Sequence, residues 1–132
     1  MRVDFHINFS GHCEAAFRYY QSVFGGELEL LSYKNSRSER ELPPNWEDKI
    51  VHGSIKINNL VIAGADVLPN EYRQPQGFHL LLQIDSKDES QRIFDALSQE
   101  GSVTMPLQKT FWSNLYGIVV DRFGISWEIN HT

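Results

Sequence analysis

The sequence predicts an α+β fold made of two copies of one βαβββ unit within a single domain. Three observations carry this prediction. Apolar and polar residues show the order strand, helix, strand, strand, strand, and this order occurs twice along the 132 residues. Each copy spans about 60 residues. The copies are separated by residues 68–77, which contain Pro, Asn and Gly in the proportion typical of a linker.

The first copy opens with a strand and a helix. Residues 3–9 alternate between apolar and polar side chains, so one face of this strand is predicted to be buried. The predicted inward residues are Val3, Phe5, Ile7 and Phe9. Ser10 and Gly11 are suited to starting the helix, and Glu14 in its first turn interacts favourably with the helix dipole. Gly25 and Gly26 are predicted to end the helix.

Three strands complete the first module, which we place at about residues 3–67. A polar segment with two prolines separates the first two of these strands and is predicted to be a loop long enough to cover a pocket. Asn58 and Asn59 form a tight turn between the last two, because asparagine tolerates positive φ. The predicted segments are strand 27–34, loop 35–49, strand 50–57 and strand 60–67.

The second module, at about residues 78–130, repeats this order. Ser86 is suited to capping its helix, and Gly101 ends that helix. The predicted strands are 78–85, 102–107, 115–121 and 125–130. His79 lies on the polar face of the first of these strands and Glu128 on the polar face of the last.

Charge and composition exclude several classes of protein. The net charge is −5 and the basic residues are scattered, which argues against binding to nucleic acid. No apolar run approaches the roughly 20 residues that a membrane-spanning helix needs, and we expect neither an anchor nor a signal peptide. Cys13 is the only cysteine, which fits a reducing cytoplasm, and we expect it to be a buried thiol.

Four segments resemble, in order and spacing, the PhnB-like branch of the vicinal oxygen chelate superfamily, which includes glyoxalase I and the bleomycin-resistance proteins. They are residues 9–27 (FSGHCEAAFRYYQSVFGGE), 50–53 (IVHG), 111–112 (FW) and 121–130 (DRFGISWEIN). The resemblance covers nearly the whole chain. It implies that the two modules form a cupped, mostly antiparallel sheet with helices on the convex side, and that relatives are commonly homodimers.

The resemblance also implies a divalent metal site on the first and last strands of each module. The matching positions in the second module are His79 and Glu128. In the first module they are Asp4, or His6 two residues further on, and a position near Ala63, whose side chain cannot ligate a metal. Imidazole and carboxylate groups suit zinc, nickel, iron or manganese. The simpler interpretation is that His79 and Glu128 are a hydrogen-bonded pair in a pocket without metal.

Other polar and aromatic residues have two interpretations each. His52, Trp112 and Tyr116 are predicted to line a small-molecule pocket, but His52 could equally be a structural histidine and the aromatic residues could belong to the core. Trp46 in the polar loop either closes over a pocket or packs down onto the protein.

Two functions from different classes follow. The first is a metal-dependent lyase, isomerase or dioxygenase acting on a substrate with vicinal oxygens, with Glu128 doubling as a catalytic base. The alternative is a non-enzymatic protein that binds a drug or metabolite without metal. We do not expect a methyltransferase that uses S-adenosylmethionine, although PhnB-like domains often carry that label, because the chain has no glycine-rich turn between a strand and a helix.

Overall fold

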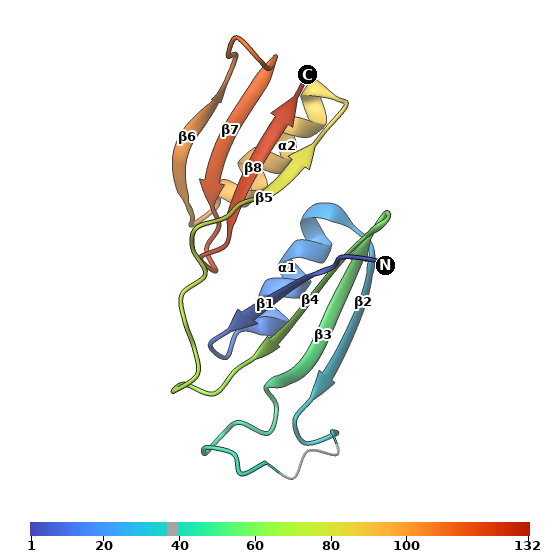
Figure 1. Ribbon diagram of the computed structural model, residues 1–132, viewed down its shortest axis with the longest axis vertical. Helices are drawn as coiled ribbons and strands as arrows, with labels where there is room; N and C mark the ends of the chain where they lie inside the picture. Colours follow the sequence, from blue (N-terminus) through green and yellow to red (C-terminus); the bar gives the residue numbers. More distant parts are fainter. Residues whose placement is uncertain (37–39) are drawn as a thin grey trace. The chain divides into compact units, whose positions relative to one another are not determined.

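The computed structural model describes residues 1–36 and 40–132 and divides into two compact units, Met1–Arg73 (unit 1) and Gln74–Thr132 (unit 2). Each unit contains one helix and four strands in the order βαβββ (Figure 1). The predicted α+β class and the predicted doubled βαβββ order are therefore confirmed. Residues 37–39 of the predicted 35–49 loop lie outside the described residues.

The sheet of unit 1 has the strand order β1-β4-β3-β2. β1 runs parallel to β4, and the other two ladders are antiparallel. The helix packs on one face of this sheet, where the apolar residues of alternating strand positions are buried. The elements are β1 (Phe5–Phe9), α1 (Cys13–Phe24), β2 (Glu27–Ser32), β3 (Ile50–Ile57) and β4 (Leu60–Asp66).

The start of β1 differs from the prediction. Ile7 and Phe9 are buried as expected, but Val3 is 78% exposed and Phe5 is 40% exposed. The parallel ladder between β1 and β4 begins with the pair Phe5 and Ile62, so Val3 lies before β1 and Phe5 is the first residue of a strand at the edge of its sheet. The alternation of apolar and polar residues therefore starts in the sequence before the first pair of the ladder.

The ends of α1 are set by a distant residue and by glycine. The helix begins at Cys13, and the residue at its N-cap, His12, makes no side-chain cap. The carboxylate of Asp66 instead accepts hydrogen bonds from the backbone N–H groups of Gly11 and Cys13, both at 2.9 Å. Gly25 ends the helix as predicted, with φ of 76° and its N–H bonded to the Gln21 carbonyl.

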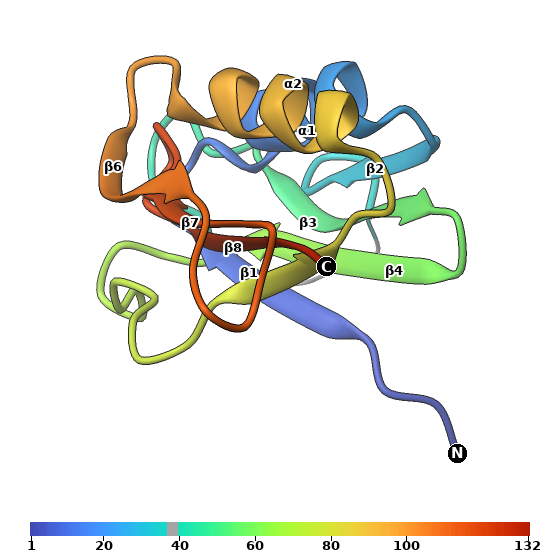
Figure 2. The same cartoon turned by 90° about the horizontal axis from the view of Figure 1, so that it is seen from above.

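Unit 2 repeats this arrangement with the strand order β5-β8-β7-β6, and β5 runs parallel to β8. Figure 2 shows that each helix lies along one side of the sheet of its own unit. Ser86 caps α2 as predicted, by accepting a hydrogen bond from the Glu89 N–H. The elements are β5 (Leu80–Gln83), α2 (Lys87–Ser98), β6 (Ser102–Gln108), β7 (Leu115–Val120) and β8 (Ser126–His131).

The strand predicted at residues 78–85 is shorter in the structure, because only Leu80–Gln83 pairs with β8. His79 therefore lies immediately before β5. Neither α1 nor α2, the helices of the described residues, is long and apolar enough to cross a membrane.

Candidate functional site

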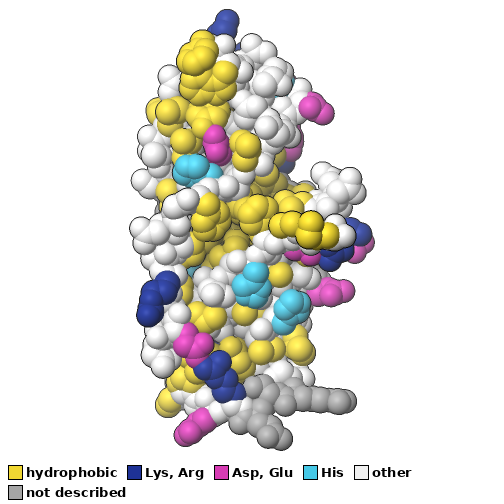
Figure 3. All heavy atoms as spheres, in the orientation of Figure 1, with side chains coloured by type: hydrophobic (Ala, Val, Ile, Leu, Met, Phe, Trp, Pro, Cys, Tyr) yellow, Lys and Arg dark blue, Asp and Glu magenta, His cyan; other side chains and the backbone are white. Residues whose placement is uncertain are grey.

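The candidate site lies on the face of the unit 2 sheet that is turned away from α2, which we call the open face of unit 2. Trp127, Ile129 and Val119 point the other way and are fully buried. Because side chains alternate along a strand, their neighbours share the open face. The strands of unit 2 lie in front of α2 in Figure 1, so Figure 3 shows this face, with a histidine and an acidic side chain close together among apolar atoms.

The register between β5 and β8 brings His79 and Glu128 to this same face. Leu81 is the partner of Glu128, and His79 precedes Leu81 by two residues. The ring nitrogen Nδ1 of His79 lies 2.6 Å from the Ser126 hydroxyl, two residues before Glu128. The predicted convergence of His79 and Glu128 on one face of the sheet thus agrees with the register, although their predicted roles remain proposals.

Glu128 is held by Tyr116 on the neighbouring strand β7. The Tyr116 hydroxyl donates a hydrogen bond to Oε1 of the half-buried Glu128. This bond raises the pKa of Tyr116 to about 12, because ionisation of the phenol would remove the donated hydrogen, and desolvation and the neighbouring carboxylate charge act in the same direction. The predicted pocket residue Tyr116 is therefore a direct partner of the predicted ligand Glu128.

A third polar pair continues the row along β5 and β8. The Asn130 amide donates to Oε1 of Gln83 at 2.6 Å. The other amide atom of Asn130, Oδ1, is buried and has no hydrogen-bond partner among the described residues. Sequence analysis did not single out Ser126, Gln83 or Asn130. The signal for all three is their period-two spacing from His79 and Glu128.

Exposed aromatic rings adjoin the site through Tyr116. Trp112 is 50% exposed and its ring lies edge-on to that of Tyr116, with a centroid distance of 5.3 Å. Phe111 is 97% exposed, and its ring centroid lies 4.6 Å from that of Trp112. Trp112 therefore does not belong to the core, which was one of its two interpretations, and neither does Phe111.

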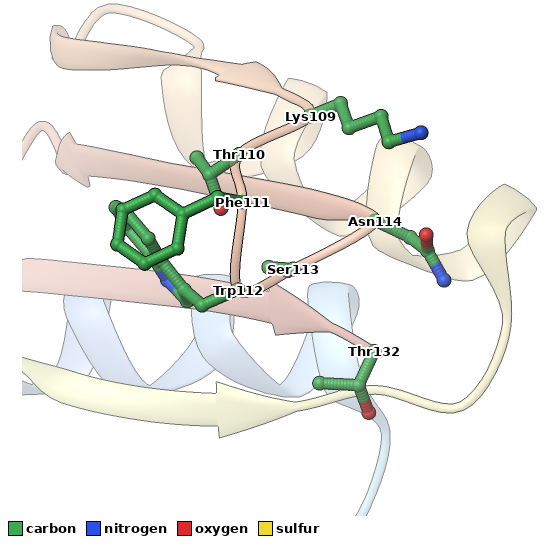
Figure 4. Close-up of a pocket in the computed structure, with 7 residues that line it drawn as sticks. All are labelled: Lys109, Thr110, Phe111, Trp112, Ser113, Asn114 and Thr132. Atoms are coloured by element: carbon green, nitrogen blue, oxygen red, sulfur yellow. The ribbon is translucent and has the colours of Figure 1, made fainter.

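The loop that carries these rings also borders a shallow hollow of about 230 Å³. Figure 4 shows the two rings on one side of the loop, and Lys109 and Asn114 pointing to the other. The hollow is lined by Lys109, Thr110, Phe111, Trp112, Ser113, Asn114 and Thr132. His79 and Glu128 do not line it, so we base the candidate site on the hydrogen-bonded polar residues rather than on this hollow.

The predicted site residues of the first module lie in unit 1. His6 is exposed on β1, and its Nε2 atom lies 3.0 Å from Oδ1 of Asn8. Its neighbour on β4 is Ala63, the predicted vacant ligand position. Asp4 is bonded to Arg2, and His52 is exposed on β3. Trp46 packs down onto unit 1, with only 8% of its surface exposed.

The donor types at the candidate site suit a divalent metal, but their number is small. An imidazole nitrogen and a carboxylate oxygen are ordinary ligands of zinc, nickel, iron and manganese. Within residues 1–36 and 40–132, no three His, Cys, Asp or Glu side chains lie close enough together to hold a metal ion. His79 and Glu128 are therefore two candidate ligands in unit 2, with no third side chain of these types grouped with them among the described residues.

The chain as a whole is similar to a known protein family and to a known protein. A model of the family described as 3-demethylubiquinone-9 3-methyltransferase matches residues 2–130 of the chain. The chain is also similar to Protein YjdN of Escherichia coli (strain K12), with 32% identity over 134 residues, covering 95% of this chain and 91% of that protein.

Solved structures show the same fold. Protein PA1353 from Pseudomonas aeruginosa aligns with a TM-score of 0.91 and 35% identity over 99% of this chain and 97% of its own. A PhnB protein from Bacillus cereus aligns with a TM-score of 0.81 and 24% identity over the whole of both chains (100% and 100%). A glyoxalase/bleomycin resistance protein/dioxygenase family enzyme from Burkholderia phytofirmans PsJN shares the fold at 15% identity, with a TM-score of 0.65 and 98% of each chain covered.

Proposed function

Because this chain belongs to the PhnB-like family described as 3-demethylubiquinone-9 3-methyltransferase, we propose that it binds a small molecule on the open face of unit 2 through a divalent metal ion. His79 and Glu128 are the proposed ligands. The fold is that of the glyoxalase/bleomycin resistance/dioxygenase superfamily. We propose lyase, isomerase or dioxygenase chemistry on a substrate with vicinal oxygens.

One observation supports this proposal above the others. Each proposed ligand is held by one hydrogen bond, and its second nitrogen or oxygen atom remains able to coordinate a metal. His79 uses Nδ1 towards Ser126, and Glu128 uses Oε1 for the Tyr116 hydroxyl. The described residues place no hydrogen bond on Nε2 of His79 or Oε2 of Glu128. Histidine ligands of metals almost always bond through their second ring nitrogen to a protein group in this way.

The bound metal would supply Lewis acidity that polarises the oxygens of the substrate. The chain's own residues would orient that substrate and handle its protons. Glu128 is the proposed base, since a carboxylate that binds a metal weakly can also accept a proton. His6 lies in unit 1, and its role as a metal ligand stays a prediction, which the variant His6→Ala tests.

Metal titration followed by calorimetry and elemental analysis tests the proposal. We expect the unmodified protein to bind about one equivalent of Ni²⁺ or Zn²⁺, and His79→Ala and Glu128→Gln to bind at least about 10-fold more weakly. The control is Glu100→Gln, which makes the same charge change in unit 2 at a carboxylate whose side chain is 78% exposed. Absence of stoichiometric metal at any loading, or equal affinity in Glu128→Gln, would overturn the proposal.

The second candidate function is binding of a small molecule without metal. The Tyr116–Glu128 hydrogen bond favours it, because the carboxylate already has a partner within the protein. The half-exposed ring of Trp112 beside Tyr116 offers a surface for stacking, and the net charge of −5 favours cationic ligands. Quenching of Trp112 fluorescence by the cationic dye proflavine, equal with and without chelator and lost in Trp112→Ala, would support this function over the first.

Methyl transfer, the activity in the family's description, is not part of this proposal. In the described strands only one ladder of each sheet is parallel, between β1 and β4 and between β5 and β8. A nucleotide-type cofactor is usually bound by a series of parallel βαβ units. Saturable binding of S-adenosylmethionine in calorimetry would contradict this choice.

We also propose that the protein is a cytoplasmic homodimer. Within the described sheets, β2 and β6 are edge strands, and unpaired edges favour association with another chain. Gel filtration with light scattering tests the dimer. A particle with the mass of one chain in dilute buffer would contradict it.

A further inference from the structure

We propose that Asn130 and Gln83 form a specificity-determining pair that recognises an amide edge of the ligand. Such an edge is a carbonyl oxygen and an N–H group side by side, as in a lactam, an imide, a urea or a primary carboxamide. This inference rests on the proposed binding of a small molecule to the open face of unit 2, and it involves no metal ion.

The register of three strands places both amides in one row of the open face. Asn130 on β8 has Gln83 of β5 as its partner on one side and Tyr116 of β7 as its partner on the other. Partners in a ladder point to the same face of the sheet. β5 is an edge strand of its sheet and Gln83 is exposed, so a small molecule can approach the row from the β5 side.

The hydrogen bonds within this row leave one atom of each amide unused. Nδ2 of Asn130 donates to Oε1 of Gln83 at 2.6 Å, and within residues 1–36 and 40–132 this is the only hydrogen bond of the Gln83 side chain. Tyr116 directs its hydroxyl to Glu128 instead of Asn130. Oδ1 of Asn130 is buried and has no partner among the described residues. A buried acceptor without a partner is uncommon and costs free energy, which a ligand N–H would restore.

The two unused atoms are complementary to an amide. Oδ1 of Asn130 accepts a hydrogen bond and Nε2 of Gln83 donates one, whereas the amide edge of a ligand offers an N–H donor and a carbonyl acceptor. The match also holds if the two side-chain amides turn over together. Nδ2 of Asn130 and Oε1 of Gln83 are then the unused donor and acceptor, and the same ligand edge satisfies both.

Apolar groups close to the amide pair indicate an apolar body for the ligand. Leu81 lies two residues before Gln83 on the same face of β5 and is 50% exposed. The Trp112 ring, also 50% exposed, lies against Tyr116. Small-molecule sites typically combine such surface with a few polar groups that fix the orientation of the ligand. We therefore expect a planar, largely apolar molecule with one amide edge.

The first experiment compares 2-quinolone, a planar lactam, with N-methyl-2-quinolone, in which a methyl group replaces the amide hydrogen. Binding is followed in ¹H–¹⁵N spectra through the side-chain amide signals of Asn130 and Gln83. We expect 2-quinolone to shift both signals, and the N-methyl compound to bind at least about 10-fold more weakly because it leaves the Asn130 amide unpaired. Equal affinities of the two compounds, or no binding of 2-quinolone at millimolar concentration, would overturn the proposal.

The second experiment removes each amide at nearly constant volume, in Gln83→Leu and Asn130→Leu. We expect each variant to bind 2-quinolone at least about 10-fold more weakly and to lose the preference over the N-methyl compound. Gln91→Leu is the matched control, because Gln91 is an exposed amide on α2, on the other side of the sheet. Circular dichroism checks the fold of each variant. Gln83 is exposed on an edge strand, so unchanged binding in Gln83→Leu would overturn the proposal whatever the stability of Asn130→Leu.

The outcomes separate this inference from the proposed metal function. If the protein binds Ni²⁺ through His79 and Glu128 but does not distinguish the two quinolones, the role of the amide pair is wrong and the metal site stands. If 2-quinolone is preferred, the preference is lost in Gln83→Leu, and no metal binds at any loading, then the metal function is wrong and the amide pair is supported.

Discussion

Units 1 and 2 share one strand order but carry different chemistry on their open faces, which in unit 1 is the sheet face turned away from α1. In both, the first strand pairs in parallel with the last, and the helix lies on the opposite side from the open face. At the centre of the open face, unit 2 has Glu128 between Leu81 and Ile118. Unit 1 has Ala63 between His6 and Ser54. The comparison teaches that the helix side maintains the fold, while the open face is free to differ.

The helix sides use the same packing device. Phe17 of α1 sits on Gly53 of β3, and Phe94 of α2 sits on Gly117 of β7. Gly53 and Gly117 occupy the third strand of their units. A side chain at either position would meet the aromatic ring of the helix, so glycine permits the close approach of helix and sheet.

Buried carboxylates also separate structure from candidate function. Asp66 is 1% exposed and accepts three backbone N–H groups, from Gly11, Cys13 and Ile50. Asp121 is 3% exposed and accepts two backbone N–H groups and the Trp127 indole. Glu128 has one hydrogen bond and is only half-buried. A carboxylate whose partners are complete has a structural role, whereas Glu128 has capacity for a ligand.

The largest effect is expected from removing those buried carboxylates. Asp66→Ala leaves three backbone N–H groups without an acceptor, each costing about 1–3 kcal/mol, so the free energy of unfolding should fall by at least about 3 kcal/mol. Asp121→Ala should have a similar effect on unit 2. Urea unfolding followed by circular dichroism measures both. A loss below about 1 kcal/mol in either variant would show that the two carboxylates are not equivalent supports.

A smaller effect distinguishes the two glycines. In Gly117→Ala the new Cβ would lie 2.8 Å from the Phe94 ring and 3.0 Å from the Leu107 backbone. In Gly53→Ala its nearest neighbours are side-chain atoms of Leu30 and Phe17, at 3.0 and 3.3 Å. Overpacking of this kind costs about 1–3 kcal/mol, and we expect Gly117→Ala to be the more destabilising, because backbone yields less than a side chain. The reverse order in thermal unfolding would contradict this reasoning.

The smallest effect on stability is expected from Glu128→Gln on the open face, within about 0.5 kcal/mol. The measurable effect of Glu128→Gln is instead on the Tyr116 phenol, because its pKa of about 12 should fall towards the ordinary 10.0. The folded protein favours the neutral phenol. The contribution of the Tyr116–Glu128 hydrogen bond to the free energy of unfolding is therefore complete below pH 10 and is lost as the pH rises towards 12. Ultraviolet titration against Tyr116→Phe isolates this phenol, and an unchanged midpoint would mean that Glu128 is not its partner.

Periodicity predicted most of the fold but could not locate where strand pairing begins or ends. The doubled order and the Ser86 cap follow from local patterns. Val3 and Phe5 were wrongly placed in the core, because alternation does not reveal where a strand begins or that the strand lies at the edge of its sheet. Likewise, Asp66 reaches Gly11 across 55 positions of sequence, and no local pattern predicts that contact.

For the candidate site, too, the sequence predicted which residues share a face but not which side chains contact one another. Period-two spacing assigned His79 and Glu128 to polar faces, and the family resemblance paired them. Tyr116 was predicted only as a pocket residue, and its hydrogen bond to Glu128, like the contact of Ser126 with His79, required the register of β8 with its two neighbours. A shift of one residue in that register would send the same side chains to the other face, so their contacts follow from tertiary structure alone.

The position of the last strand in each unit has a consequence for synthesis on the ribosome. β4 lies between β1 and β3, and β8 lies between β5 and β7. The only partner of the opening strand is therefore the last strand of its unit, which is synthesised about 50 residues later. The opening strand cannot pair before that segment has left the ribosome. Until then the nascent chain can form only local hairpins and helix, and each unit should close in a single late step.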